Sequence, residues 1–89
     1  MTTQEHTIIN EKGLHARASA KLVEVVEAHD ASAQVSKDGL EASGDSIMGL
    51  LMLAAARGTT IEVTTKGPDA EKLADAIGAL VADKFGEAM

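Results

Sequence analysis

The pattern of apolar and polar positions along the chain predicts four strands. The clearest covers residues 59–66, where apolar and polar side chains alternate with the period of a strand buried on one face. A weaker strand is predicted over residues 4–9, which end in two isoleucines. Residues 32–43 predict a hairpin, because Asp38 and Gly39 between its arms form a pair that accepts the positive φ angles of a tight turn.

Three further stretches repeat apolar residues every three or four positions, which is the spacing of a helix with one buried face. The first covers residues 16–29. The second begins at Asp45 or Ser46, since either side chain can accept a hydrogen bond from the free N–H groups of a first helical turn. Gly58 is the expected end of this second helix. The third covers residues 69–84.

The resulting order of elements is β-α-β-β-α-β-α. We expect a single domain over residues 1–89, because two domains would each fall below the size that holds a hydrophobic core. Four strands and three helices predict an α+β sandwich of two layers, with the helices covering one face of a sheet. From the order alone a ferredoxin-like split βαβ fold is a candidate. Periodicity does not decide the order of the strands, so other arrangements stay open.

Composition and charge exclude several classes of function. The chain is 45% hydrophobic and 25% charged, which is typical of a folded protein. It has no cysteine, which excludes a disulfide framework, a thiolate zinc site and thiol catalysis. Its net charge of −6, without a run of lysine or arginine, argues against nucleic acid and against an anionic membrane surface. Phe85 is the only Phe, Trp or Tyr, so the chain offers no platform for stacking bases.

A cytoplasmic location is expected. The first six residues lack the basic region and apolar core of a signal peptide. The longest nearly apolar run, residues 47–56, is far shorter than the ~20 residues that span a bilayer, so no membrane insertion is expected.

His15 differs from the other two histidines, His6 and His29, in its position at a predicted helix start. Unpaired N–H groups and the helix dipole favour an anion there, and Arg17 adds donors suited to phosphate. An imidazole in this position can act as a nucleophile toward phosphorus. The alternative, which position alone favours, is an exposed histidine at a helix cap beside a solvated Arg17. No histidine pair has the spacing of a metal site, so neither metal nor cofactor is expected.

The start of the second helix offers a second candidate site. Ser46 is most simply a helix cap, and a phosphate added to it would lie where the helix dipole favours negative charge. The apolar residues that follow are too many for one buried face: Ile47, Met48, Leu50 and Leu51. Some of them are therefore expected to face outward as a docking surface, and the alternative is a fully covered core helix.

Two segments resemble the signatures of the HPr family, the histidine phosphocarriers of the bacterial phosphotransferase system. Residues 13–18, Gly-Leu-His-Ala-Arg-Ala, are similar to the family's active-site segment. Residues 46–49, Ser-Ile-Met-Gly, resemble its second signature, around a regulatory serine. The separation of the two segments, the chain length and the order of elements agree with the family as well. The resemblance implies an HPr-like open-faced β-sandwich, with four antiparallel strands and three helices on one face, in place of the ferredoxin-like fold.

The resemblance also implies a mechanism. Enzyme I, charged by phosphoenolpyruvate, would pass its phosphoryl group to Nδ1 of His15, which would pass it to a histidine of an EIIA-type protein. Arg17 and the backbone N–H groups of Ala16 and Arg17 would hold the phosphoryl oxygens. The protein would then be a phosphocarrier and not an enzyme. The family analogy gives four residues that would form the patch docking both partners: Ala20, Ile47, Met48 and Leu51.

Regulation and assembly follow from the same resemblance. Ser46 would be the target of an HPr kinase/phosphorylase, and the added charge would weaken docking of Enzyme I. A carrier that meets two partners by one face is expected to be a monomer. A regulatory binding module of the same fold that transfers no phosphate is the alternative, and the presence of both His15 and Arg17 favours the carrier. The sequence leaves open whether the output is sugar uptake or nitrogen regulation.

Overall fold

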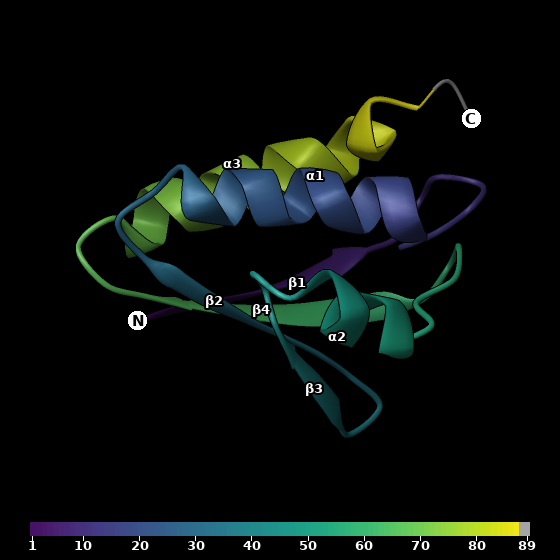
Figure 1. Cartoon of the computed structure of the whole chain (residues 1–89), viewed down its shortest axis with the longest axis horizontal. Helices are drawn as coiled ribbons and strands as arrows, with labels where there is room; N and C mark the ends of the chain where they lie inside the picture. The colour runs from purple at the N-terminus through teal and green to yellow at the C-terminus, as the bar shows by residue number, and fades with distance from the viewer. Residues whose placement is uncertain (88–89) are drawn as a thin grey trace.

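The helices and strands of the chain follow the predicted order in the computed structural model, which describes residues 1–87. A short 3-10 turn, η1, comes after the last helix. The elements are β1 (Thr2–Thr7), α1 (Ala16–Glu27), β2 (Ser32–Lys37), β3 (Leu40–Ser43), α2 (Ile47–Met52), β4 (Thr60–Lys66), α3 (Ala70–Ala82) and η1 (Lys84–Gly86) (Figure 1).

The four strands form one sheet in the order β1-β4-β2-β3, and every neighbouring pair is antiparallel. β4, the clearest strand of the sequence, lies inside the sheet, where Val63 pairs with Gln4 of β1 and with Val35 of β2. A split βαβ fold contains parallel neighbours, so the ferredoxin-like candidate is wrong. The open-faced sandwich is confirmed.

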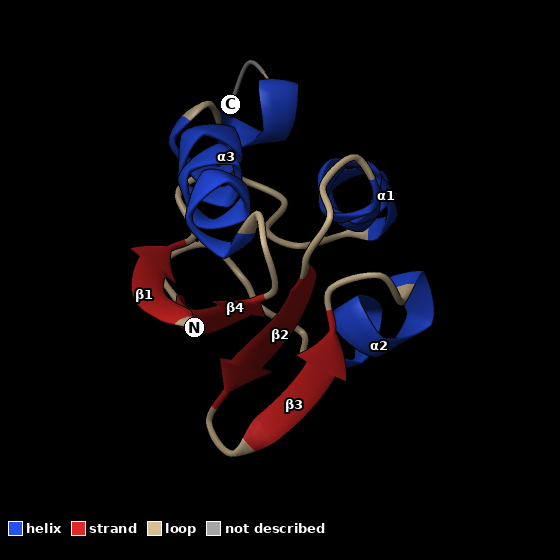
Figure 2. Ribbon diagram, turned by 90° about the vertical axis from the view of Figure 1, so that its left-hand side faces the viewer, coloured by secondary structure: helices blue, strands red, loops and turns tan. Residues whose placement is uncertain are grey.

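The helices cover one face of the sheet only. α3 lies over β1 and β4, α1 lies beside α3, and α2 packs against α1 and β3 (Figure 2). Ile61, Val63 and Thr65 of β4 point into this layer and are buried, whereas Glu62 between them is exposed. The open face carries polar, exposed side chains on all four strands: Thr3, Glu5, Thr7, Ser32, Gln34, Glu41, Ser43, Thr60, Glu62 and Lys66.

The second helix is much shorter than predicted. α2 has six residues and ends at Met52, so the expected end at Gly58 was wrong. Ala54 has a φ of 51°, a left-handed conformation that stops the helix. Lys37 then supplies donors to the carbonyl groups of the helix end, with Nζ 3.1 Å from Leu53 O and 3.3 Å from Ala54 O. A side chain that is distant in sequence therefore ends α2 where local pattern alone predicts continuation.

The third helix also ends early, at Ala82 instead of residue 84. Lys84 and Phe85 both have a φ of 55°, and Gly86 has a φ of 77°, so the chain reverses direction. Left-handed backbone costs roughly 1–2 kcal/mol for each non-glycine residue. This cost is offset by the Phe85 side chain, which is fully buried. Burying such a side chain contributes roughly 1.5–3 kcal/mol to the stability of the fold. Lys21 Nζ donates to Phe85 O at 2.7 Å and holds the reversed segment against α1.

Two smaller features complete the fold. β1 covers Thr2–Thr7, so it begins and ends two residues earlier than predicted. Ile8 lies beyond the strand, and its side chain is buried in the core. Its backbone N–H donates to Thr59 O at 2.8 Å, and its carbonyl oxygen accepts from Gly58 N at 2.7 Å. None of the helices within residues 1–87 has the length and apolar character needed to cross a bilayer.

Candidate functional site

His15 occupies the N-cap position of α1, and the loop before it is fixed to the segment after α2. Gly13 has a φ of 65° and lies so close to this segment that a Cβ atom there would be 2.4 Å from Ala55 O. Leu14 N donates to the same Ala55 O at 2.8 Å. Only glycine fits at residue 13. The loop therefore holds His15 in front of the helix at a defined position.

The N–H groups of the first turn of α1 point toward the surface around His15. The first helical hydrogen bond of the turn joins Ser19 N to His15 O at 2.8 Å, so Ala16, Arg17 and Ala18 have no carbonyl partner within the helix. The His15 side chain does not cap them, and the first turn contains no acidic residue. These donors and the helix dipole together make a site that favours an anion.

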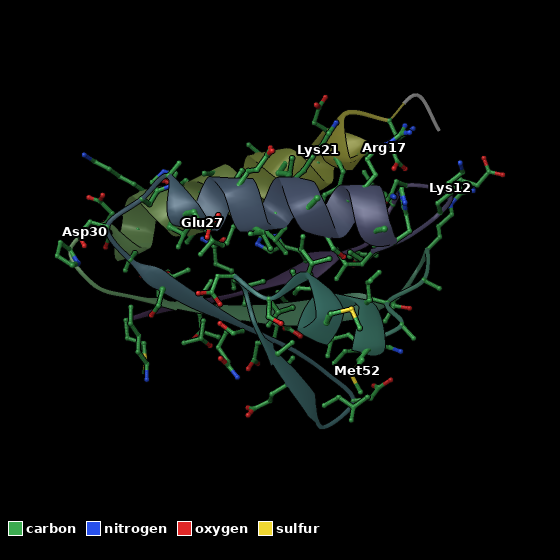
Figure 3. All side chains as sticks on the ribbon, viewed as in Figure 1. Lys12, Arg17, Lys21, Glu27, Asp30 and Met52 are labelled. Atoms are coloured by element: carbon green, nitrogen blue, oxygen red, sulfur yellow. The ribbon has the colours of Figure 1, made fainter. Side chains whose placement is uncertain are left out.

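Arg17 adds a guanidinium group to this end of the helix. Its side chain is exposed and makes no hydrogen bond or ion pair to any side chain or backbone group of residues 1–87. Lys12 lies at the same end of α1, in the loop that leads to His15 (Figure 3). Because Arg17 breaks no contact with residues 1–87 when it turns to a ligand, it can bind the oxygens of a phosphoryl group without that competing cost.

The imidazole of His15 contacts the carboxylate of Glu87, which follows η1. His15 Nε2 lies in hydrogen-bonding contact with Glu87 Oε2. The other carboxylate oxygen accepts from Asn10 Nδ2 at 2.9 Å, and Asn10 Nδ2 also donates to Gly13 O at 2.8 Å. The hydrogen bonds from Asn10 and His15 hold the pKa of Glu87 below its usual value, so this carboxylate is ionised at neutral pH.

Asn10 and Glu87 were not among the residues predicted for the site. Asn10 precedes the glycine loop and is fully buried, a position that polar residues of loops rarely take without a partner. The signal that could have pointed to Glu87 is the pair Phe85-Gly86, since the lone aromatic followed by glycine after the last helix indicates a chain reversal.

A shallow depression of about 280 Å³ lies next to His15. It is lined by Lys12, Leu14, His15, Leu51 and Ala54–Ala56. The side chains that line it are apolar apart from those of His15 and Lys12. The depression joins the histidine to the surface of α2 through Leu51, and His15 keeps 27% of its side chain exposed.

The surface of α2 carries exposed apolar side chains. Ile47 is 40% exposed and Met48 is 70% exposed, whereas Leu50 is fully buried, so the prediction that some of these residues face outward is confirmed. Leu51 is half-buried, and so is Ala20, which lies on α1 one turn after Ala16. Met52, four residues after Met48, is 76% exposed and was missed, although its helical spacing from Met48 places it on the same side.

Ser46 caps α2, and Asp45 does not. Ser46 Oγ accepts from Gly49 N at 3.1 Å, while Asp45 Oδ1 accepts from Ser43 Oγ at 2.5 Å. The interpretation of Ser46 as a helix cap is therefore confirmed. Its side chain is half-buried and lies directly before the exposed Ile47.

The other two histidines lie outside this site. His6 is half-buried in β1 against Gly78 of α3, and burial lowers its pKa. His29 Nδ1 lies 2.7 Å from Val25 O at the end of α1, where the ring caps a carbonyl group of the last turn. Within residues 1–87, no group of three or more His, Cys, Asp or Glu side chains is arranged to hold a metal ion.

Comparisons with known proteins agree with this arrangement. The family model described as the phosphorylation site of the PTS HPr component matches residues 2–83. The phosphocarrier protein HPr of Cupriavidus necator is 45% identical over 87 residues, which cover 98% of each chain. The phosphocarrier protein NPr of Shewanella violacea is 46% identical over 82 residues, covering 92% of this chain and 90% of the relative. HPr-C-His from Thermoanaerobacter tengcongensis superposes over the whole of both chains with a TM-score of 0.94 and 31% identity. The chain therefore belongs to the HPr family of phosphocarrier proteins of the phosphotransferase system.

Proposed function

We propose that His15 carries the phosphoryl group of this phosphocarrier, taking it from phosphorylated Enzyme I and passing it to a histidine of an EIIA-type protein. The observation that carries this assignment is the meeting of three features at one end of α1. These are the imidazole of His15, the N–H groups of Ala16 and Arg17, which have no carbonyl partner within the helix, and the Arg17 guanidinium, which has no partner among residues 1–87. As a member of its family the protein is a carrier and not an enzyme.

The chemistry at His15 needs one nucleophile and donors for the phosphoryl oxygens. A ring nitrogen forms the new N–P bond while the bond from phosphorus to the donor breaks, and the negative charge spreads over three oxygens in the transition state. N–H groups of Ala16 and Arg17 and the guanidinium of Arg17 face that charge. Because these groups are already in place, they stabilise the transition state without reorganising. Each partner protein supplies the rest of the active site when it docks.

The proposed docking patch comprises Ala20, Ile47, Met48 and Leu51, and the exposure of Met52 supports including it as well. Three of these side chains, Ile47, Met48 and Met52, are exposed, and Leu51 joins the patch to the depression beside His15. Exposed methionines suit a surface that must fit two different partners, because the flexible thioether adapts its packing. Since one patch serves Enzyme I and the acceptor in turn, a single copy of the chain is enough, and we propose a monomer. A cytoplasmic location belongs to the same proposal.

Ser46 is the regulatory residue of the proposal. A phosphate on its Oγ adds a charge of roughly −1.5 to −2 beside Ile47 and Met48 of the docking patch. It also replaces the hydroxyl that now accepts from Gly49 N. An HPr kinase/phosphorylase acting on Ser46 would therefore weaken the docking of Enzyme I, because a charge must then be buried in an apolar interface.

Intact-mass measurement tests the assignment of His15. The protein is mixed with phosphoenolpyruvate and Enzyme I of the sugar branch or of the nitrogen branch in separate reactions. Wild type and His29→Ala are expected to gain one acid-labile phosphoryl group, whereas His15→Ala gains none. The faster reaction identifies the branch. Phosphorylation of folded His15→Ala to the wild-type level would overturn the assignment.

A further inference from the structure

The position of Glu87 beside His15 is built by the chain reversal after α3. Phe85 is fully buried under the reversed segment, and Lys21 Nζ holds its carbonyl oxygen at 2.7 Å. The backbone closes the turn through Gly86 N to Asp83 O and Glu87 N to Lys84 O, both at 2.9 Å. Because Phe85 is anchored in the core, the carboxylate two residues later is directed back to the start of α1. Figure 1 shows this last described segment above the N-terminal end of α1.

Both oxygens of the Glu87 carboxylate are engaged. Oε1 accepts from Asn10 Nδ2 at 2.9 Å, and Oε2 contacts His15 Nε2. Asn10 is itself fully buried and bonded to the Gly13 carbonyl of the histidine loop, so it cannot move away with the carboxylate. Only 14% of the Glu87 side chain is exposed. The carboxylate therefore has one fixed anchor and one contact with the reactive ring.

This contact distinguishes the two nitrogens of the ring. An ionised carboxylate can only accept hydrogen bonds, so the neutral imidazole must present an N–H at Nε2 to Glu87. A neutral imidazole carries one proton only, and the free lone pair is then on Nδ1. A carboxylate that fixes the tautomer of a histidine through its second nitrogen is a known device for orienting nucleophiles, bases and metal ligands.

We propose that Glu87, held by Asn10, is a positioning residue that keeps the proton of neutral His15 on Nε2 and so makes Nδ1 the atom that attacks phosphorus. This role rests on the proposed function of His15 as the carrier of the phosphoryl group.

The transfer step balances without a further group. The Nδ1 lone pair forms the N–P bond, and the electron pair of the breaking bond leaves with the donor. Nε2 keeps its proton, so the phosphorylated ring bears a positive charge, which the Glu87 carboxylate faces and stabilises. When the acceptor histidine takes the phosphoryl group, the electron pair of the N–P bond returns to Nδ1. Glu87 stays ionised throughout and exchanges no proton.

The test combines a spectroscopic and a kinetic measurement on the full chain. The ¹⁵N chemical shifts of the His15 ring, recorded on the unphosphorylated protein with a neutral ring, report which nitrogen carries the proton. The rate of phosphoryl acceptance from Enzyme I is measured on the same samples. The variants are Glu87→Ala, Glu87→Asp, which keeps a carboxylate, and Asp83→Asn, which removes one negative charge from an exposed residue four positions earlier.

We expect wild type and Asp83→Asn to hold the proton on Nε2 alone. Glu87→Ala is expected to show a mixture of the two tautomers and to accept the phosphoryl group about ten-fold more slowly, and Glu87→Asp to recover part of both. Circular dichroism and thermal unfolding of Glu87→Ala are the control for an intact fold, which we expect to be kept.

Two results would overturn the role of Glu87 and leave the carrier function intact. One is phosphorylation of His15 in Glu87→Ala at the wild-type rate with an unchanged tautomer. The other is a wild-type ring that carries its proton on Nδ1. Failure of the wild-type protein to accept a phosphoryl group at His15 is a different result, because it overturns the proposed function itself.

Discussion

The two ends of α1 use a histidine in opposite ways. At the C-terminal end, His29 donates to Val25 O through its ring, while its backbone N–H and that of Ala28 bond to carbonyls of the last turn. At the N-terminal end, the His15 ring makes no hydrogen bond to the free N–H groups of the first turn and contacts Glu87 instead. One end is closed by its own residues, and the other keeps its donors unpaired. The difference supports the proposal that the uncapped end of α1 is the anion site, because free N–H groups are otherwise a cost to the fold.

Charge separates along the same helix. The chain has a net charge of −6, yet Lys12 and Arg17 lie at the end where α1 begins, whereas Glu27 and Asp30 lie toward the other end (Figure 3). Net charge therefore describes the molecule as a whole and not the surroundings of His15. Lys12 and Arg17 at the N-terminal end add to the field of the helix dipole there.

The largest expected effect comes from removing Phe85, the buried side chain that holds Glu87 near the N-terminal end of α1. Phe85→Ala leaves a cavity under the chain reversal, and we expect a loss of about 3–5 kcal/mol in the free energy of unfolding. Urea unfolding followed by circular dichroism measures it. In the molecules of Phe85→Ala that stay folded, the contact between Glu87 and His15 should also be lost, because the Phe85 side chain no longer fixes the segment that carries Glu87. A loss below about 1 kcal/mol would mean that Phe85 is not held in the core.

Arg17→Ala should slow phosphoryl acceptance by about 100-fold, the usual effect of removing one donor that faces developing charge in a transition state. Stability should stay the same within about 0.5 kcal/mol, because the Arg17 side chain is exposed and unpaired within residues 1–87. Rapid-quench kinetics with Enzyme I measures the rate. Lys66→Ala, which removes a cation from the open face of the sheet, is the matched control and should react as wild type does.

His29→Ala tests the closed end of the helix. We expect a loss of about 1 kcal/mol in the free energy of unfolding, because one hydrogen bond to Val25 O disappears. The rate of phosphoryl acceptance should not change. Equilibrium unfolding and the phosphorylation assay together decide the point. A slower transfer in this variant would contradict the separation of roles between the two helix ends.

The smallest expected effect concerns His6, which lies at neither end of α1. Burial lowers its pKa from the ordinary 6.5, so the unfolded chain binds a proton more readily than the folded one. Its contribution to stability is therefore fully present above pH 6.5 and is lost as the pH falls from there through the lowered pKa of the folded state. Unfolding experiments on wild type and His6→Gln over this range measure the difference. Equal pH dependence of the two proteins would contradict this assignment.

Much of the arrangement is predictable because it depends on neighbours in sequence. The alternation over residues 59–66 identifies β4, and Ser46 is recognisable as a cap from its place before Ile47. The helix start at His15 follows from the preceding glycine and the apolar spacing after it. By contrast, the early end of α2 depends on Lys37, whose ammonium group reaches Leu53 O from another element. No pattern within residues 47–57 contains that information.

The sequence by itself determined the elements of this protein, the position of His15 before a helix and the family to which the chain belongs. The tertiary structure alone decided which side chain meets the ring. Asn10 and His15 lie 77 and 72 positions before Glu87, and nothing local connects them. They meet because Lys84 and Phe85 adopt left-handed backbone that their own sequence disfavours. The burial of Phe85 in the common core compensates for that conformation, and burial is a property of the whole fold.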